Sequence, residues 1–210
     1  MPKDPQQPEP QQESESGPLD TMGLARAAKA GELERFSELY ERLAPALLTW
    51  ARLRIRPAWR AHIDETDVVQ EVWCRAWRAF PDFDADHIPF RYWTFRIAKN
   101  VLLEASRKLR SAGAAAGSTT RLLMLSQVPD EATGLTQRVR RDEGLELFAD
   151  WAQDLPEEDR KLLLHVGLEG LPHNEAAERL GISTEALSKR WQRLKQRIEE
   201  HPLPRQLMAD

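Results

Sequence analysis

The sequence predicts an all-α protein: two small helical domains joined by a flexible linker, the C-terminal one a helix-turn-helix. Along most of the chain, apolar side chains recur at the i, i+3 and i+4 spacing of amphipathic helices. Residues 111–141 are instead mainly small and polar, interrupted by glycines and a proline, which is typical of a linker. A Gly-Ile-Ser turn at 181–183 separates two short helical patterns, as in helix-turn-helix domains.

Composition limits the classes to which this chain can belong. Its 210 residues are 41% hydrophobic, enough for one helical domain or two small ones. The single cysteine, Cys74, lies in an apolar helical pattern, so we expect no disulfide, no metal site and a reducing, cytoplasmic location. No apolar run approaches the roughly 20 residues that a membrane span needs. We expect no cofactor.

The net charge of −4 bears on how the protein would meet DNA. Proteins that bind DNA unaided neutralise phosphates with a surplus of Lys and Arg, which this chain lacks. Its basic residues are concentrated locally, and much of the acidity lies near the N-terminus. We therefore expect a partner to bring the protein to DNA.

The N-terminal half begins with a tail and continues with helices. Residues 1–20 are rich in Pro, Gln and Glu and almost lack apolar side chains, which predicts a disordered acidic tail. A first domain is expected over 21–110. Its first amphipathic helices are expected to break at Gly31 and Pro45.

Two longer helices complete this predicted domain, one over about 65–80, ended by Pro81, and one over about 90–110. The side chains expected to face the core from the first helix are Val69, Val72, Trp73, Ala76, Trp77 and Phe80. Those expected to do so from the second are Phe90, Trp93, Ile97, Val101, Ala105 and Leu109. A linker at 111–141, a helix-turn-helix domain at 142–201 and a tail at 202–210 follow.

The helix-turn-helix prediction depends on Gly181 and Ser183. Gly181 can adopt the left-handed conformation that ends a helix, and Ser183 can cap the next one. In that next helix an apolar stripe from Leu187 to Ile198 leaves the basic residues on other sides. The alternative is an ordinary solvated basic surface. The candidate DNA contacts are Thr184, Glu185, Ser188, Lys189, Arg190 and Arg193.

The helix over 90–110 carries a second group of candidates on the side away from its apolar stripe. Aromatic rings beside cations bind single-stranded bases, with stacking of about 1–3 kcal/mol per base. Tyr92 and Phe95 lie between these polar residues, and the sequence does not decide whether they face the core. The candidates for strand binding are Tyr92, Arg96, Lys99, Asn100 and Arg107.

Asp67, Gln70 and Glu71 share one edge of the helix over 65–80. They are candidates for a protein contact, although Glu71 could instead simply pair with Arg75. The segments 67–71, 75–77 and 90–100 resemble the core region of bacterial extracytoplasmic-function sigma factors of the sigma-70 family. The segments that resemble the family's promoter-upstream domain are 155–160, 169–171, 175–183 and 187–190.

The resemblance implies a role for each candidate group. Asp67, Gln70 and Glu71 would contact the clamp of the largest subunit of core RNA polymerase. The loop 81–89 would hold a flipped base of the minus-ten element, beside the strand-binding candidates. The helix-turn-helix would engage the minus-thirty-five element. The implied partners are core RNA polymerase, through that clamp and the flap of the second largest subunit, promoter DNA, and an anti-sigma factor.

Some positions depart from the family pattern. Pro172 stands where a capping Ser is common, which predicts a shifted helix start involving Asn174. Ser188 and Trp191 also differ from common family residues, so promoter preference does not transfer. The main alternative function is a stand-alone helix-turn-helix transcriptional regulator that binds duplex DNA without polymerase. We expect no catalytic residue, because the histidines are scattered and no catalytic motif occurs.

Overall fold

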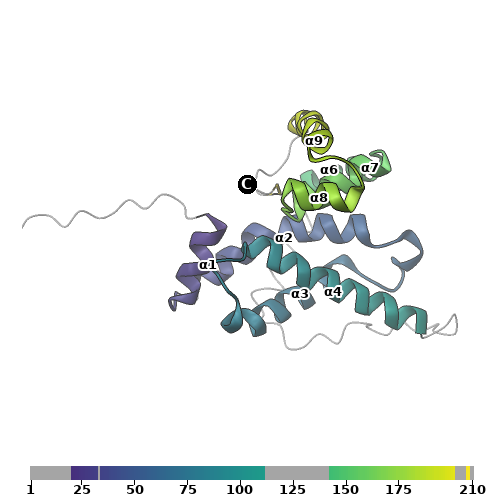
Figure 1. Cartoon of the computed structure of the whole chain (residues 1–210). Helices are drawn as coiled ribbons and strands as arrows, with labels where there is room; N and C mark the ends of the chain where they lie inside the picture. The colour runs from purple at the N-terminus through teal and green to yellow at the C-terminus, as the bar shows by residue number, and fades with distance from the viewer. Residues whose placement is uncertain (1–19, 33, 112–141, 202–206, 209–210) are drawn as a thin grey trace, which may run out of the picture.

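The computed structural model describes residues 20–32, 34–111, 142–201 and 207–208. All regular secondary structure within these residues is helical, which confirms the all-α class (Figure 1). The helices form two groups, one on each side of the undescribed segment 112–141. The predicted disordered tail and linker, including a short apolar run at 122–125, lie outside the described residues, except for Asp20 and Ser111.

The first group contains four α-helices and two short 3-10 turns. Asp20 and Asp64 cap the first and third α-helices, because their carboxylates accept hydrogen bonds from the amides of Gly23 and Thr66 at 2.6 and 2.7 Å. Gly31, at φ 110°, separates the first two α-helices as predicted. The elements are α1 (Thr21–Lys29), α2 (Glu34–Arg54), η1 (Pro57–Trp59), α3 (Glu65–Ala79), η2 (Phe80–Asp82) and α4 (Phe90–Ser111).

Pro45 does not break a helix, and this prediction was wrong. It lies inside α2, within an unbroken run of buried residues from Leu43 to Ala51. A proline costs a helix interior roughly 3 kcal/mol, whereas burial of one large apolar side chain contributes about 1.5–3 kcal/mol. Burial of the whole run therefore outweighs the missing hydrogen bond. The hydroxyl of Thr49 also donates to the Pro45 carbonyl at 3.0 Å.

An aromatic cluster fills the core between α2, α3 and α4. The Phe36 ring lies 4.6 Å from Trp73 and 4.7 Å from Phe80, measured between ring centroids. Of the side chains predicted to face the core from α3, only Trp77 does not, since it is 45% exposed. Trp77 reaches Phe36 edge-on at 4.8 Å, so it lines the rim of the core. From α4, Phe90 is fully buried, while Trp93, Ile97 and Leu109 pack half-buried against the core.

The second group forms the helix-turn-helix. Gly181 is left-handed at φ 67°, and the Ser183 hydroxyl accepts a hydrogen bond from the Ala186 amide at 3.2 Å, both as predicted. The first helix of the motif itself, His173–Leu180, begins directly after Pro172, without a side-chain cap, so Asn174 does not shift its start. The elements are α6 (Glu143–Gln153), α7 (Glu157–Leu162), the π-helical η3 (Leu163–Leu168), α8 (His173–Leu180) and α9 (Thr184–Glu199).

The two groups pack directly on one another. Helix α2 contacts both α6 and η3, and buried apolar side chains of the two groups belong to one continuous core. Figure 1 shows α6 and α8 lying over α2. The prediction of separate domains on a tether did not include this packing. The packing explains why α2 is buried on all sides from Leu43 to Ala51.

Candidate nucleic-acid interface

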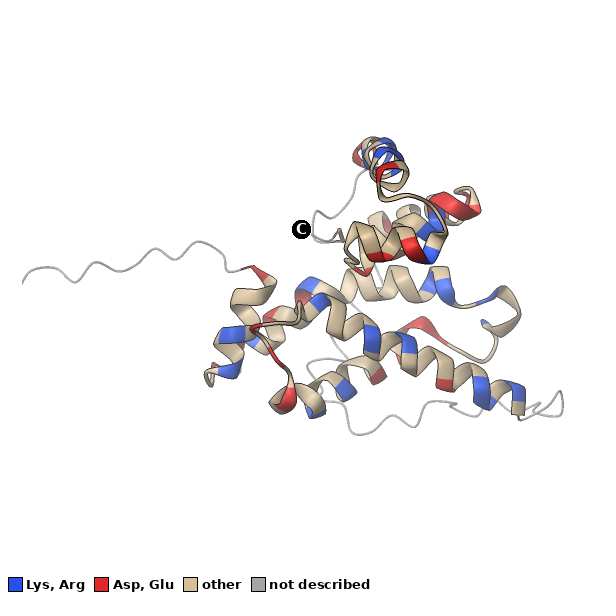
Figure 2. Ribbon diagram, viewed as in Figure 1, with Lys and Arg blue, Asp and Glu red and all other residues tan. Residues whose placement is uncertain are grey.

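Cations gather on α4 and on α9, while carboxylates are prominent on α7 and α8 (Figure 2). Helix α4 presents the exposed side chains of Arg96, Asn100 and Arg107, all of them predicted strand-binding residues. Tyr92 is half-buried beside them and packs against the core. This part of the predicted group shares one accessible surface.

Phe95 and Lys99 do not lie on that open surface. The Phe95 ring is 1% exposed and meets Trp50 edge-on, with 5.9 Å between ring centroids. It is therefore a core residue, which settles a point the sequence left open. Lys99 was expected to face away from the core, but its ammonium forms an ion pair with Glu169 at 2.6 Å. The helix-turn-helix group thus reaches a predicted DNA-binding lysine.

Glu169 is the centre of a buried polar cluster between the two helix groups. Its carboxylate is fully buried. It accepts hydrogen bonds from the Trp50 indole at 2.8 Å and from the Arg54 guanidinium at 2.9 Å. His165 Nδ1 lies 3.0 Å from its second oxygen, which also binds Lys99. Three partners come from the first group and one from the second.

Neighbouring groups and burial determine the pKa values of Glu169 and Lys99 in this cluster. Burial by itself raises the pKa of Glu169, but the hydrogen bond with His165, the charge of Lys99 and the Trp50 N–H together lower it to about 2. The carboxylate is therefore ionised at neutral pH. Burial lowers the pKa of Lys99, and the attraction to Glu169 opposes that change.

Arg91 makes a second contact between the groups. Its guanidinium donates to the backbone carbonyls of Leu168 at 2.9 Å and of Leu207 and Met208 at 3.2 Å each. Leu207 is fully buried. The sequence reasoning assigned no role to Arg91 or Glu169, although both lie in segments that carry the family resemblance. Helical periodicity gives no signal for a contact between distant helices.

The predicted protein-contact edge on α3 is largely covered. Gln70 and Glu71 are 7% and 6% exposed, and Asp67 is half-buried. Glu71 accepts a hydrogen bond from Arg75 at 2.7 Å, and Arg75 also bonds Glu104 of α4 at 2.9 Å. The pairing considered from the sequence is therefore present, and it ties α3 to α4.

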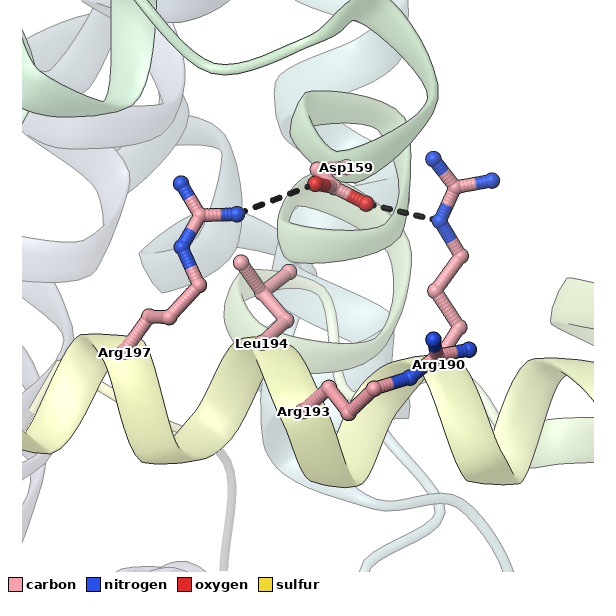
Figure 3. A pocket seen from close by; sticks show the side chains of 5 residues that line it. All are labelled: Asp159, Arg190, Arg193, Leu194 and Arg197. Carbon is pink, nitrogen blue, oxygen red and sulfur yellow. Dashed lines mark hydrogen bonds and ion pairs between the residues drawn. The ribbon is translucent and has the colours of Figure 1, made fainter.

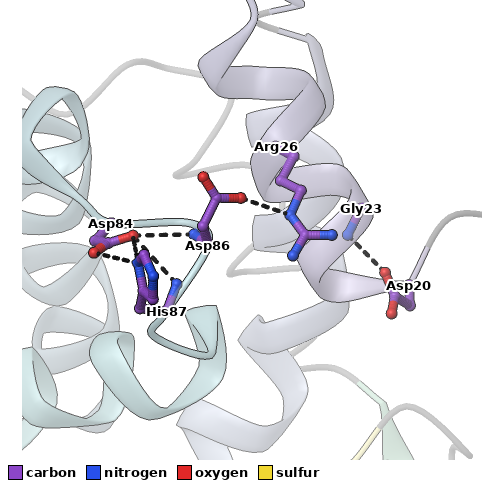
Figure 4. A network of polar contacts seen from close by, with 6 residues as sticks. All are labelled: Asp20, Gly23, Arg26, Asp84, Asp86 and His87. Atoms are coloured by element: carbon purple, nitrogen blue, oxygen red, sulfur yellow. Dashed lines mark hydrogen bonds and ion pairs between the residues drawn. The ribbon is translucent and has the colours of Figure 1, made fainter.

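The loop before α4 is held by polar contacts (Figure 4). One Asp84 carboxylate oxygen accepts hydrogen bonds from the backbone amides of Asp86 and His87, and the His87 ring lies 3.0 Å away. The hydrogen bond with His87 lowers the pKa of Asp84. Asp86 forms an ion pair with Arg26 of α1 at 3.1 Å. The ion pair between Asp86 and Arg26 thus connects this loop to α1.

The basic residues of α9 are partly neutralised by α7 (Figure 3). Asp159 accepts hydrogen bonds from Arg190 at 2.7 Å and from Arg197 at 3.2 Å, and Glu158 also pairs with Arg190. Arg193 lines the same hollow of about 380 Å³. The acidic run at 157–159 was visible in the sequence, but its position opposite α9 was not.

The other predicted contacts of the helix-turn-helix differ in how free they are. Thr184, Glu185 and Lys189 are exposed on the first turns of α9, where Lys189 and Glu185 pair at 2.6 Å. Ser188 is half-buried, and its hydroxyl lies 3.0 Å from His173 Nδ1 of α8. Ser188 therefore joins the two helices of the motif.

The described residues form neither a metal site nor a membrane span. No group of His, Cys, Asp and Glu side chains in these ranges is arranged to hold a metal ion. None of the helices they form is long and apolar enough to cross a membrane.

Comparison with known families and proteins gives matches over both helix groups. Residues 39–112 match the model of Sigma-70 region 2, and residues 151–198 match that of Sigma-70 region 4. RNA polymerase sigma factor CnrH of Cupriavidus metallidurans is 32% identical over 169 residues, covering 80% of this chain and 86% of CnrH. RNA polymerase sigma factor NccH of Alcaligenes xylosoxydans xylosoxydans is 29% identical over 177 residues, covering 83% and 90%.

A solved structure of CnrH in complex with the cytosolic domain of CnrY is also similar. It covers 86% of this chain and 96% of the CnrH chain, at 27% identity and a TM-score of 0.44.

Proposed function

This chain belongs to the sigma-70 family of RNA polymerase sigma factors, as an extracytoplasmic-function member, and from this we propose which of its residues meet polymerase and which meet DNA. As a sigma factor it acts in promoter-specific transcription initiation. We assign core binding and minus-ten recognition to residues 21–110, and minus-thirty-five recognition to residues 142–201.

The observation that best supports this division is the polar surface of α4. Arg96, Asn100 and Arg107 lie exposed on one helix, beside half-buried Tyr92 and the paired Lys99. These residues bind the single strand of the minus-ten element, and the neighbouring loop 81–89 receives a flipped base. Flipping costs a few kcal/mol of stacking, which a pocket and nearby cations can offset.

Polymerase binding is assigned to the edge of α3. Asp67, Gln70 and Glu71 contact the clamp of the largest subunit, and the helix-turn-helix group contacts the flap of the second largest. Asp67 is the most accessible of the three in the free protein. Gln70 and Glu71 are buried, so the side chains that cover them have to move when polymerase binds.

Minus-thirty-five recognition is assigned to α9. Recognition helices present their first turns to base edges, and Thr184, Glu185 and Lys189 are exposed there. Arg190, Arg193 and Ser188 complete the contact set. The pairs that Arg190 makes with α7 fix the direction of its guanidinium.

Further partners follow from the same proposal. The protein acts in the cytoplasm, where its polymerase is, and needs neither a catalytic residue nor a cofactor. An anti-sigma factor that binds this chain remains a prediction of the family resemblance.

Transcription from a promoter library by the purified protein, with and without core bacterial RNA polymerase at fixed salt, tests the proposal. We expect sequence-selective initiation only when both are present. Tight duplex binding by the protein alone, with no initiation, would instead establish the stand-alone regulator.

A further inference from the structure

The contact between the two helix groups is built around one carboxylate. Glu169 stands at the end of the π-helical segment η3 and is fully buried. Lys99, Arg54 and Trp50 of the first group all direct donors at it, at 2.6 to 2.9 Å. These three donors, an ammonium, a guanidinium and an indole N–H, could equally bind an oxygen of a DNA backbone phosphate.

The neighbouring contact closes the same surface. Arg91 lies on α4, two helical turns before Lys99, and donates to the carbonyl of Leu168, the residue next to Glu169. Arg91 and Lys99 therefore both reach one turn of the second group. While that turn is in place, neither cation is available to a DNA strand running along α4.

We propose that Glu169 is an intramolecular competitor of the promoter strand. In the free factor it pairs with Lys99 and holds the two helix groups closed, and the strand gains the full charge of Lys99 when Glu169 leaves. This inference rests on the proposed function, which places Lys99 in the minus-ten surface. Core polymerase, which binds both helix groups in that proposal, supplies the free energy that separates them.

Glu169 and a DNA phosphate would compete for the same ammonium. Lys99 has a single ammonium, which is partly buried against a carboxylate that has no exposure to solvent. While the carboxylate stays, it neutralises that ammonium and takes one of its donors, so a phosphate that approaches from the exposed side gains less from Lys99 and is repelled by Glu169. Closed packing and strand binding at Lys99 therefore oppose one another.

Single-molecule energy transfer between two labels measures the closure directly. The labels are placed on Ala79→Cys in α3 and Gln196→Cys in α9, which are exposed positions, in a chain where buried Cys74 is replaced by Ala. Binding of a mixed-sequence single-stranded DNA is measured on the same proteins. Addition of core polymerase is expected to shift the labelled protein to the open population.

Two variants loosen the cluster in different ways. Glu169→Gln keeps the shape but removes the charge, leaving the partly buried Lys99 and Arg54 without their anion, and should raise the open-to-closed ratio about tenfold or more. Trp50→Phe keeps the charge and removes the N–H donor together with part of the buried ring, and should raise the ratio less. Arg52→Gln removes the pair with Glu146 across the same interface and the pair with Glu65 inside the first group, but no partner of Glu169, so it serves as the control and should leave the ratio unchanged.

The DNA measurement separates the possible outcomes. We expect both variants to open and to bind the single strand more tightly. Addition of Lys99→Met to either variant should abolish the gain in strand binding. An unchanged label distance in both variants overturns the closure, and promoter-dependent initiation by the unaltered protein would show that the proposed function survives. Opening with no response of strand binding to Lys99→Met overturns the competition together with the role assigned to Lys99.

Discussion

Glu169 is fully buried and yet ionised, because its four neighbours replace the solvation that burial removes. A surface ion pair contributes little to stability, since water screens it and long side chains must be ordered. At Glu169 the donors come from α2, α4 and η3, so loss of the charge would affect several elements at once. Protonation of Glu169 in acid should therefore destabilise the contact between these elements.

Acid should weaken the protein through Glu169. Its pKa is about 2 in the folded protein against an ordinary value of 4.5, so the carboxylate stabilises the folded state above pH 4.5, and this contribution is lost as pH falls toward 2. The full contribution is roughly 3 kcal/mol in the free energy of unfolding. Urea unfolding at pH 6 and at pH 3 should show a loss of about 2 kcal/mol from this group, because pH 3 still lies above the pKa of the folded protein. Because other carboxylates also titrate, Glu169→Gln is the control, and an equal loss in both proteins would contradict the assignment.

Single residues of the two proposed contact surfaces should separate polymerase binding from DNA binding. Arg190→Ala should weaken minus-thirty-five binding by about tenfold or more, with core association unchanged, because a lost base or phosphate contact costs about 1–3 kcal/mol. Glu71→Ala should do the reverse. Arg197→Ala is the control for Arg190, since it also loses an Asp159 contact but lies outside the proposed contact set. Equal loss of core binding in Arg190→Ala and Glu71→Ala would refute the division.

Periodicity predicted where most helices lie but not every side chain's neighbour. The helices around Glu65–Ala79 and Phe90–Ser111 were predicted to within a few residues, because their apolar stripes are regular and prolines precede or end them. The prediction failed at Pro45, because the rule that proline breaks a helix considers only local structure. In α2 the burial of the surrounding side chains determines whether the helix continues. The uninterrupted apolar run beside it was the available signal, because a helix that is apolar all round is buried on all sides.

Replacement of Pro45 should show the balance within α2. Pro45→Ala restores an amide donor to the helix and loses part of a buried ring, so we expect a net gain of about 1 kcal/mol in the free energy of unfolding. Ala46→Pro adds a second proline ring at the next position and should destabilise by about 3 kcal/mol or more. Chemical denaturation of the three proteins measures both changes. A loss of stability in Pro45→Ala would mean that packing of the ring dominates.

The turn of the helix-turn-helix depends on one backbone conformation. Gly181 has φ 67°, and no other group lies within 4 Å of the point where a Cβ would be attached. Gly181→Ala should therefore cost about 1–2 kcal/mol through backbone strain alone. Gly181→Asn should cost less, because Asn adopts this conformation more readily. Thermal unfolding of both variants tests this order, and equal losses would point to steric contact instead.

At the scale of the whole molecule, the sequence could predict two helix groups but not their contact. A periodic pattern shows which side of a helix is apolar, whereas the partner of that side is decided by distant residues. Lys99 was expected on the polar side of its helix, and no role was predicted for Glu169 or Arg91. Their meeting depends on how α2 is shared, and α2 contributes Trp50 and Arg54 to the buried cluster. The candidate DNA surface was thus predicted by residue type, but its closed state was not.

A shared core predicts that the two groups unfold together. The buried side chains of both groups form one cluster, so the unaltered protein should show a single transition, with calorimetric and van't Hoff enthalpies in agreement. Arg91→Met removes the donors to three backbone carbonyls of the second group and its C-terminal residues, and should split the transition into two. Calorimetry, together with tryptophan fluorescence, follows both steps.

The matched control for Arg91→Met is Arg60→Met. Arg60 also bonds across the interface, to Gln153 at 3.1 Å, but this contact is exposed to solvent. Because an exposed contact contributes little, Arg60→Met should keep a single transition. Two transitions in the unaltered protein would show that the groups fold independently, and that the buried charges around Glu169 do not couple them.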